Sequence, residues 1–306
     1  MKKALCVGIN NYRGTANDLQ GCLNDVSDWS DLLSQNGFEN TIIKDSVATR
    51  SKIKSTLGSM ISASQSGDVL VFQYSGHGTS VIDQSGDEAD SYDEALYVYD
   101  GVLLDDELRE IFLSIPAGVQ MIVILDSCFS GTATRVALRS AAKRRYVQTD
   151  VIKRSMKKRK SFLIGEDMKE TLIAGCGDDE YSYDAEFDGR PNGAFSRYAI
   201  DTIQKDLTYA KFIDLLNIKL PSSDYPQTPQ LECSTANAKR LLFSSSTGDV
   251  PDSTGDEFRF EFQDKSCTGE VTFKNNKWTA NINDFQSTSR VSAISAILAV
   301  IKKWSA

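Results

Sequence analysis

The sequence is poor in histidine, in closely spaced cysteines and in long apolar runs. It contains one histidine, and its six cysteines are spread along 306 residues without a C-x-x-C pair. Zinc sites and disulfide frameworks both need several such side chains at suitable spacing, so neither is supported. We therefore expect reduced thiols, of interest for reactivity rather than for bridging.

Signals for membranes and nucleotides are also missing. No stretch approaches the roughly eighteen consecutive apolar residues of a membrane-spanning helix. The first apolar run, residues 4–9, leads into Asn10 without a small-residue cleavage site, so it is expected to be a buried strand rather than a signal peptide. No G-x-x-x-x-G-K-S/T loop and no G-x-G-x-x-G after a strand is present, which leaves nucleotide chemistry without support. We expect a cytoplasmic protein with no membrane partner.

Charge is distributed very unevenly along the chain. Residues 135–160 hold eleven basic side chains and one acidic one, whereas the whole chain has a net charge of −8. A block of like charge is typical of a long mobile loop, and either a solvated insertion or a nucleic-acid patch would fit it. Because the rest of the chain is acidic and would repel phosphate, we predict no nucleic-acid partner. A basic loop on an acidic body favours docking onto its own protein.

Apolar runs alternate with segments of helical spacing along most of the chain. The expected strands are residues 4–9, 38–43, 69–74, 119–125, 171–176 and a short stretch within 231–243; the expected helices are 18–35, 49–64, 105–113, 194–204 and 209–220. Such alternation predicts an α/β fold, with a mostly parallel six-stranded sheet flanked by helices on both faces.

A change in composition follows this main domain, which we assign to residues 1–243. Residues 244–256 are rich in Ser, Thr, Gly, Asp and Pro, as in a linker. Residues 257–283 then alternate like two or three antiparallel strands, and residues 290–304 have helical spacing. We predict a small α+β extension over residues 257–306.

His77 and Cys128 are the residues that suggest chemistry. Each follows the end of an expected strand, and His77 lies between Gly76 and Gly78. Taken alone, His77 could be a structural residue and Cys128 a small buried hydrophobe. Ligands of parallel sheets bind beyond the carboxyl ends of the strands, so the two residues are expected at the same edge, although 51 positions separate them.

A histidine beside a cysteine can perform nucleophilic catalysis. A thiol needs a neighbouring base to form thiolate at neutral pH, and His77 would supply it and later protonate a leaving amine. The backbone N–H groups of Gly78 and Cys128 lie where strand hydrogen bonding ends. They are therefore the expected donors of an oxyanion hole.

Two motifs resemble a known family. Tyr-Ser-Gly-His-Gly-Thr at 74–79 and Asp-Ser-Cys-Phe-Ser-Gly at 126–131 resemble metacaspases and their prokaryotic caspase-like relatives, the orthocaspases. The similarity extends to residues 8–12, 19–26 and 227–231 and covers about residues 3–243. It implies a caspase-like fold and a cysteine endopeptidase, typically a monomer.

The resemblance also implies a preference for basic side chains. In metacaspases, the positions of Asp25 and Asp126 line an acidic pocket for Arg or Lys, with those of Cys22 and Ser75 beside it. Two carboxylates in a closed pocket would pair with a guanidinium and reject an acidic side chain. Without the resemblance, Asp25 would be an exposed helix residue and Asp126 a strand-end cap. We predict protein or peptide substrates with Arg or Lys before the cleaved bond.

The basic loop, taken as residues 135–165, acquires a role from the same resemblance. In this family a segment after the catalytic cysteine is often cut by the enzyme itself, which frees or rearranges the active site. We predict a zymogen that cleaves itself between residues 135 and 160, and the choice of bond remains open.

A cluster of carboxylates suggests calcium. Clustered carboxylates in a loop that contains glycine suit Ca²⁺, although the spacing is not that of an EF-hand. Many metacaspases depend on calcium and some prokaryotic relatives need none, while a solvated acidic loop is the simpler alternative. No organic cofactor is expected. The candidate ligands are Asp87, Glu88, Asp90, Asp93, Asp105 and Asp106.

Two rival functions remain. The chain could be a catalytically silent caspase-like scaffold whose acidic surface binds a basic partner, but an intact pair of His77 and Cys128 argues against this. It could also belong to clostripain-like or separase-like peptidases with other substrates. The Gly-Cys-x-Asn-Asp stretch at 21–25 and Thr-Pro-Gln-Leu at 228–231 favour metacaspases.

Overall fold

The computed structural model describes residues 1–82, 92–128, 142–147, 168–177 and 180–244, together with four strands between residues 258 and 289. The chain forms two compact units, Met1–Thr247 and Gly248–Ala306. The first unit carries all the residues of the candidate site that the structure describes.

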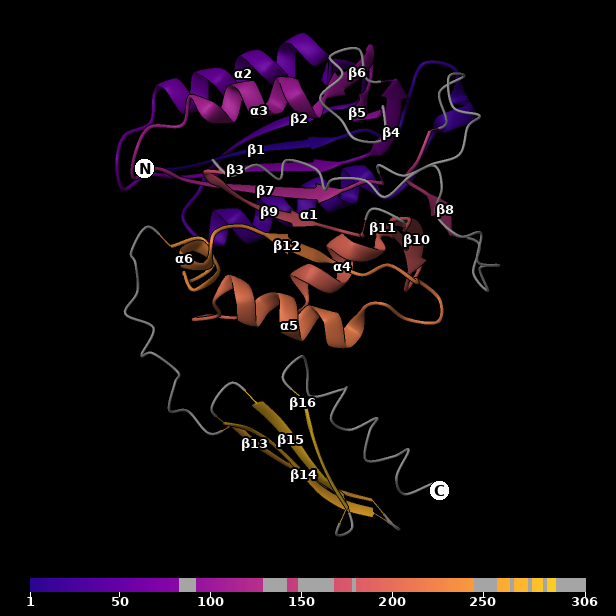
Figure 1. Cartoon of the computed structure of the whole chain (residues 1–306). Helices are drawn as coiled ribbons and strands as arrows, with labels where there is room; N and C mark the ends of the chain where they lie inside the picture. The colour runs from indigo at the N-terminus through magenta and orange to yellow at the C-terminus, as the bar shows by residue number, and fades with distance from the viewer. Residues whose placement is uncertain are drawn as a thin grey trace. The chain divides into compact units, whose positions relative to one another are not determined.

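A six-stranded sheet lies at the centre of the first unit, as expected for an α/β fold (Figure 1). Its strands are ordered β12-β9-β7-β3-β1-β2, and the pairs β9-β7, β7-β3, β3-β1 and β1-β2 are parallel. Only the short edge strand β12 runs antiparallel to its neighbour β9. The strands are β1 (Lys2–Gly8), β2 (Glu39–Lys44), β3 (Val69–Ser75), β7 (Gln120–Asp126), β9 (Glu170–Ala174) and β12 (Gln230–Glu232).

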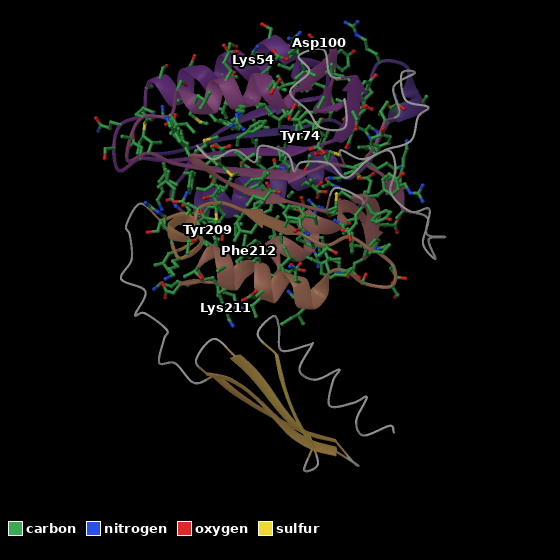
Figure 2. All side chains as sticks on the ribbon, viewed as in Figure 1. Lys54, Tyr74, Asp100, Tyr209, Lys211 and Phe212 are labelled. Carbon is green, nitrogen blue, oxygen red and sulfur yellow. The ribbon has the colours of Figure 1, made fainter. Side chains whose placement is uncertain are left out.

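Helices cover both faces of this sheet (Figure 1). On one face, α2 (Arg50–Ser62) and α3 (Asp105–Leu113) bury Leu57 and Phe112 in one apolar core. On the other face lie α1 (Cys22–Gln35), α4 (Ala194–Ile200) and α5 (Tyr209–Lys219). Figure 2 shows Tyr209 and Phe212 of α5 on the side facing the sheet, and Lys211 directed away from it.

The central strands bring the two motifs together. Every residue of β3 and β7 is buried, which suits strands covered by helices on both faces. The last residues of the two strands, Ser75 and Asp126, are partners in the parallel register. His77 and Cys128 each follow two positions later, so both leave the sheet at the same edge.

Two small sheets, which the sequence analysis did not predict, lie at this edge. One consists of β4 (His77–Ile82), β5 (Tyr92–Val98) and β6 (Gly101–Leu104). The other consists of β8 (Lys143–Arg144), β10 (Tyr183–Phe187) and β11 (Arg190–Gly193). The first begins with the candidate base, and the second contains part of the basic loop.

Two predicted helix boundaries are wrong. The helix expected over residues 194–204 ends at Ile200, the last residue of α4. The helix expected over residues 18–35 begins only at Cys22, preceded by a short 3₁₀ turn, Thr15–Asn17. Residues before Cys22 have other hydrogen bonds: Asp18 accepts from the N–H of Tyr12, and Gly21 donates to Asp184. By contrast, the expected helix over 105–113 agrees with α3 at both ends. A last short helix, α6 (Thr235–Ala238), follows β12.

The second unit contains an antiparallel sheet ordered β13-β14-β15-β16. Its strands are β13 (Phe258–Asp264), β14 (Cys267–Lys274), β15 (Lys277–Ile282) and β16 (Phe285–Ser289). Four strands therefore stand where two or three were expected. The helix predicted over 290–304, and the linker after Ser244, lie outside the described residues. Across the described part of the chain, no helix has the length and apolar character needed to span a membrane.

Candidate active site

His77 is held at the start of β4 with its two ring nitrogens in different surroundings. Its backbone N–H donates to the hydroxyl of Tyr12 at 2.8 Å, and the centroids of the His77 and Tyr12 rings lie 5.0 Å apart. Its Nε2 lies 2.7 Å from the carbonyl oxygen of Asn17. A carbonyl only accepts, so Nε2 carries the proton and Nδ1 carries the lone pair. Nδ1 is buried and has no hydrogen-bond partner among the residues that the structure describes.

The surroundings of His77 keep it neutral. Burial lowers the pKa of the imidazole to about 4, and the positive charges of Lys143 and Arg145 act in the same direction. The backbone carbonyls of Asn17 and Arg145 oppose this shift. At neutral pH the ring is therefore unprotonated at Nδ1 and able to accept a proton.

Cys128 is buried directly after β7, with its sulfur against the backbone of Ser182. The N–H of Ser182 donates to Sγ at 2.7 Å. When protonated, the same thiol donates to the carbonyl of Ser182 at 3.3 Å. A neighbouring thiol, Cys176, has its pKa raised well above the ordinary value by a hydrogen bond with Cys128 and by burial, so Cys176 stays protonated.

The acidic pocket is filled by Arg145, a residue of the basic loop. This side chain is entirely buried. Its Nη2 lies 2.6 Å from Oδ2 of Asp25 and 2.9 Å from Oδ1 of Asp184, and its Nη1 lies 3.1 Å from Oδ2 of Asp126. Three carboxylates therefore surround one guanidinium. Asp25 and Asp126 had been predicted at this pocket, whereas Arg145 as its occupant and Asp184 as its third acid had not.

Surrounding donors fix the carboxylates in place. Oδ1 of Asp25 accepts from the side-chain amide of Asn192 at 3.0 Å and from the N–H of Gly193 at 2.8 Å. Oδ2 of Asp126 accepts from both the N–H and the hydroxyl of Ser196, at 3.0 and 2.7 Å. Burial raises the pKa of Asp25 to about 6, and Arg145 acts against this shift. The pocket is thus held ready for a cation and is least favourable when empty.

The two other residues predicted beside the pocket, Cys22 and Ser75, are both buried. Cys22 begins α1, and its N–H donates to Oδ1 of Asn10 at 2.9 Å. Burial raises the pKa of its thiol well above the ordinary value, and Arg145 is near enough to act in the opposite direction. Ser75 ends β3 and accepts from Nε2 of Gln73 at 2.8 Å.

The backbone of Arg145 lies across the site as a bend between β8 and Tyr146, which forms a parallel bridge with Gly78. Its carbonyl oxygen accepts from the N–H of Gly78 at 3.0 Å and from the N–H of Cys128 at 3.2 Å, the two predicted oxyanion donors. Its own N–H donates to the carbonyl of Ser182 at 2.9 Å, and the N–H of Val147 donates to the carbonyl of Gly78 at 3.1 Å. Upstream, β8 pairs antiparallel with β10. Added-strand pairing of this kind is a common way to bind a peptide.

The predicted calcium ligands are only partly described. Asp87, Glu88 and Asp90 lie outside the described residues, and Asp93 is described only as part of β5. Asp105 and Asp106 form the first turn of α3, where carboxylates complement a helix N-terminus. Among the described side chains, no group of three His, Cys, Asp or Glu residues could hold a metal ion. Because the other candidate ligands lie outside the described side chains, calcium binding stays a prediction.

Comparison with known proteins agrees with this geometry. Residues 2–137 match the model of the metacaspase peptidase C14 domain. Metacaspase-1 of Schizosaccharomyces pombe is 31% identical, over 76% of this chain and 67% of that protein. Metacaspase-1 of Mycosarcoma maydis is 30% identical, over 79% of this chain and 72% of that protein. The chain belongs to the metacaspase family. It is therefore a caspase-like cysteine-type peptidase, and proteins are its substrates.

Solved structures support the fold of this metacaspase. A crystal structure of a Geobacter sulfurreducens protein superimposes with a TM-score of 0.63 at 27% identity, covering 79% of this chain and 98% of that one. Caspase-1 of Spodoptera frugiperda superimposes with a TM-score of 0.52 at 13% identity, covering 76% of this chain and 85% of that one. The caspase-like fold predicted from the sequence is confirmed.

Proposed function

We propose that this metacaspase cleaves peptide bonds after Arg or Lys, with Cys128 as nucleophile and His77 as base, and that it cleaves its own bond between Arg145 and Tyr146. One observation carries the proposal. The Arg145 guanidinium occupies the acidic pocket while the Arg145 carbonyl accepts from Gly78 and Cys128. This is how the residue before a cleaved bond must lie.

The reaction would proceed through an acyl-enzyme. Nδ1 of His77 takes the proton of the Cys128 thiol, and Sγ attacks the carbonyl carbon of Arg145. The oxyanion that forms accepts from the N–H groups of Gly78 and Cys128. The bond to the nitrogen of Tyr146 then breaks, and the imidazolium returns its proton to that amine. Water, deprotonated by His77, hydrolyses the thioester and releases the carboxylate of Arg145 and the thiol.

The pocket supports a preference for Arg over Lys and against Asp. The two Nη atoms of a guanidinium reach three carboxylates at 2.6–3.1 Å, whereas an ammonium is a single point charge. An acidic side chain would bring a further negative charge into a buried group of carboxylates and lose its hydration without a partner.

The same contacts support a zymogen. Before cleavage, Arg145 blocks the pocket against other substrates, and cleavage after Arg145 frees the loop to leave. Nucleophile, base and pocket all come from one chain, which favours a monomer. The cysteines whose side chains are described, Cys6, Cys22, Cys128, Cys176 and Cys233, are all unpaired, which favours the reducing cytoplasm.

The test combines peptide hydrolysis with intact-mass analysis of the protein. Two fluorogenic peptides, with Arg or Asp before the cleaved bond, are offered to wild type, Cys128→Ala and Cys233→Ala, each with calcium and with a chelator. We expect hydrolysis of the Arg peptide only, a mass corresponding to cleavage after Arg145, and loss of both in Cys128→Ala. Cys233→Ala is the matched control, because it removes a half-buried thiol outside the site.

A different result would select among the alternatives. Hydrolysis that survives in Cys128→Ala would refute the assignment of the nucleophile. Silence toward both peptides, with the loop uncut under every condition, would favour the scaffold, whose pocket would hold a basic side chain without cutting it. The chelator samples test the calcium expectation directly.

A further inference from the structure

Tyr181 contacts the residues on both sides of Arg145. The guanidinium carbon of Arg144 lies over its ring, 4.4 Å from the centroid. The ring of Tyr146 meets it edge-on, with centroids 6.2 Å apart and an interplanar angle of 62°. Tyr181 is itself 6% exposed. It also directly precedes Ser182, which accepts from the N–H of Arg145, so its backbone is part of the cradle for this strand.

A second tyrosine holds the same guanidinium. Arg144 is the register partner of Tyr183 in the pairing of β8 with β10. Burial raises the pKa of Tyr183, while the charge of Arg144 and a hydrogen bond with it act in the opposite direction. The side chain of Arg144 therefore lies against the two tyrosines, while that of its neighbour Arg145 lies in the acidic pocket.

The next residue upstream is also bound through its charge. Nζ of Lys143 donates to the backbone carbonyl of Asp18. Lys143 lines a cavity together with Asp18, Glu186 and Tyr225. Three consecutive basic side chains thus meet three different environments: a cavity that Asp18 and Glu186 help to line, the face of an aromatic ring, and the acidic pocket.

We propose that Tyr181 is a specificity-determining residue that selects an arginine directly before the Arg or Lys at the cleaved bond and favours an aromatic residue directly after that bond. The substrate class is therefore a run of basic residues followed by an aromatic one, as in Lys143-Arg144-Arg145-Tyr146. This inference rests on the proposed cleavage after Arg145 and adds to it the two neighbouring positions. A guanidinium over an aromatic face gains from the ring quadrupole, and the gain grows as water is excluded.

The test measures a ratio rather than an activity. Fluorogenic peptides ending in Lys-Arg-Arg and Lys-Ala-Arg are compared by kcat/KM for the self-processed wild type, Tyr181→Phe and Tyr181→Leu. We expect wild type to prefer Lys-Arg-Arg about fivefold, as a partly buried cation–π contact implies. The preference should persist in Tyr181→Phe, which keeps the ring. It should fall toward one in Tyr181→Leu, which keeps apolar bulk and leaves only the contact with Tyr183.

A matched control is available in the same chain. Arg13 lies over the ring of Tyr99 with 5.6 Å to the centroid. Tyr99→Leu therefore removes a contact of the same kind away from the bound strand, and it should leave the ratio at its wild-type value. A ratio lowered equally by Tyr99→Leu would overturn the inference, because a general loss of stability would then explain the effect.

A second measurement covers the case in which Tyr181→Leu does not fold. Arg144→Ala changes only the bound strand, and it should slow self-cleavage after Arg145 about fivefold, with Arg144→Lys between Ala and wild type. Replacing Tyr146 by Ala in full-length protein should also slow this cut, and Tyr146→Phe should not.

The outcomes distinguish the two proposals. If wild type hydrolyses both peptides equally, or if Arg144→Ala cuts itself at the wild-type rate, the role of Tyr181 is refuted and cleavage after Arg stands. If no peptide with Arg at the cleaved bond is hydrolysed and the loop stays intact, the proposed function fails and the role of Tyr181 fails with it.

Discussion

Asp184→Asn is the most informative change to the pocket. Oδ1 of Asp184 lies 2.9 Å from Nη2 of Arg145 and accepts from the N–H of Gly21, also at 2.9 Å; Oδ2 accepts from the N–H of Gln20 at 2.7 Å. An amide oxygen in its place still accepts from one of these N–H groups, so the fold keeps most of its contacts. What disappears is one negative charge, and with it a charge-assisted hydrogen bond to the bound guanidinium.

The size of this loss follows from the burial of both groups. Hydrogen bonds to charged groups contribute about 1.5–3 kcal/mol. At about 1.4 kcal/mol for each factor of ten, kcat/KM for a peptide with Arg before the cleaved bond should fall about 10- to 150-fold. The other two carboxylates remain, so the activity should not disappear.

The assay uses self-processed enzyme and steady-state hydrolysis of one Arg peptide, with thermal unfolding measured on the same samples. Glu110→Gln is the control, because it removes an exposed carboxylate from α3 and leaves the pocket intact. A change of less than twofold in Asp184→Asn, with an unaltered melting temperature, would refute the reasoning, since the third carboxylate would then contribute nothing to binding.

Three further predictions concern the same site. The rate of self-cleavage, measured by intact mass against time, should fall as the pH drops through about 6. The raised pKa of Asp25 lets its carboxyl become protonated there and lose its attraction for Arg145, while His77, with a pKa of about 4, stays neutral. A fall in rate only near pH 4 would assign the pH dependence to His77 instead. Gly193→Ala should reduce kcat/KM on Arg peptides about 5- to 150-fold. A Cβ there would lie 2.6 Å from Nη1 of Arg145 and closer still to Oδ2 of Asp126, an overlap that costs about 1–3 kcal/mol; wild-type kinetics would count against it. Tyr12→Phe should lower the free energy of unfolding in urea by about 1–3 kcal/mol, since the buried N–H of His77 loses its acceptor, and an unchanged unfolding midpoint would contradict this.

The central sheet could be predicted because its strands have a pattern of their own. β3 and β7 are continuous apolar runs that stay buried along their whole length, and helices with apolar faces separate the parallel strands. The positions of His77 and Cys128 at one edge then follow from the parallel topology alone. The start of α1 was misplaced because the residues before Cys22 have helical spacing, although Gly21 is used to bind Asp184.

The small sheets could not be predicted, since their strands are defined by their partners. β8 is two basic residues long and has no apolar alternation, and it is a strand only because β10 pairs with it. Asp184 lies in β10, so its place in the pocket depends on the same pairing. Charge segregation did indicate that the basic loop docks onto an acidic body. The charge pattern does not indicate which of the eleven basic side chains enters the acidic pocket.

The backbone, rather than the side-chain charge, supports the choice of one bond. Lys143 and Arg144 are as basic as Arg145, and any of the three satisfies a simple requirement for a cation. Hydrogen bonds on both sides of Arg145 set the register: its N–H donates to Ser182, and the N–H of Val147 donates to Gly78. With these in place, only the carbonyl of Arg145 can face the N–H groups of Gly78 and Cys128. The pairing that sets the register does not depend on the guanidinium, so Arg145→Lys should be cut at the same bond. The cut should be slower, because an ammonium cannot reach the three carboxylates as a guanidinium does.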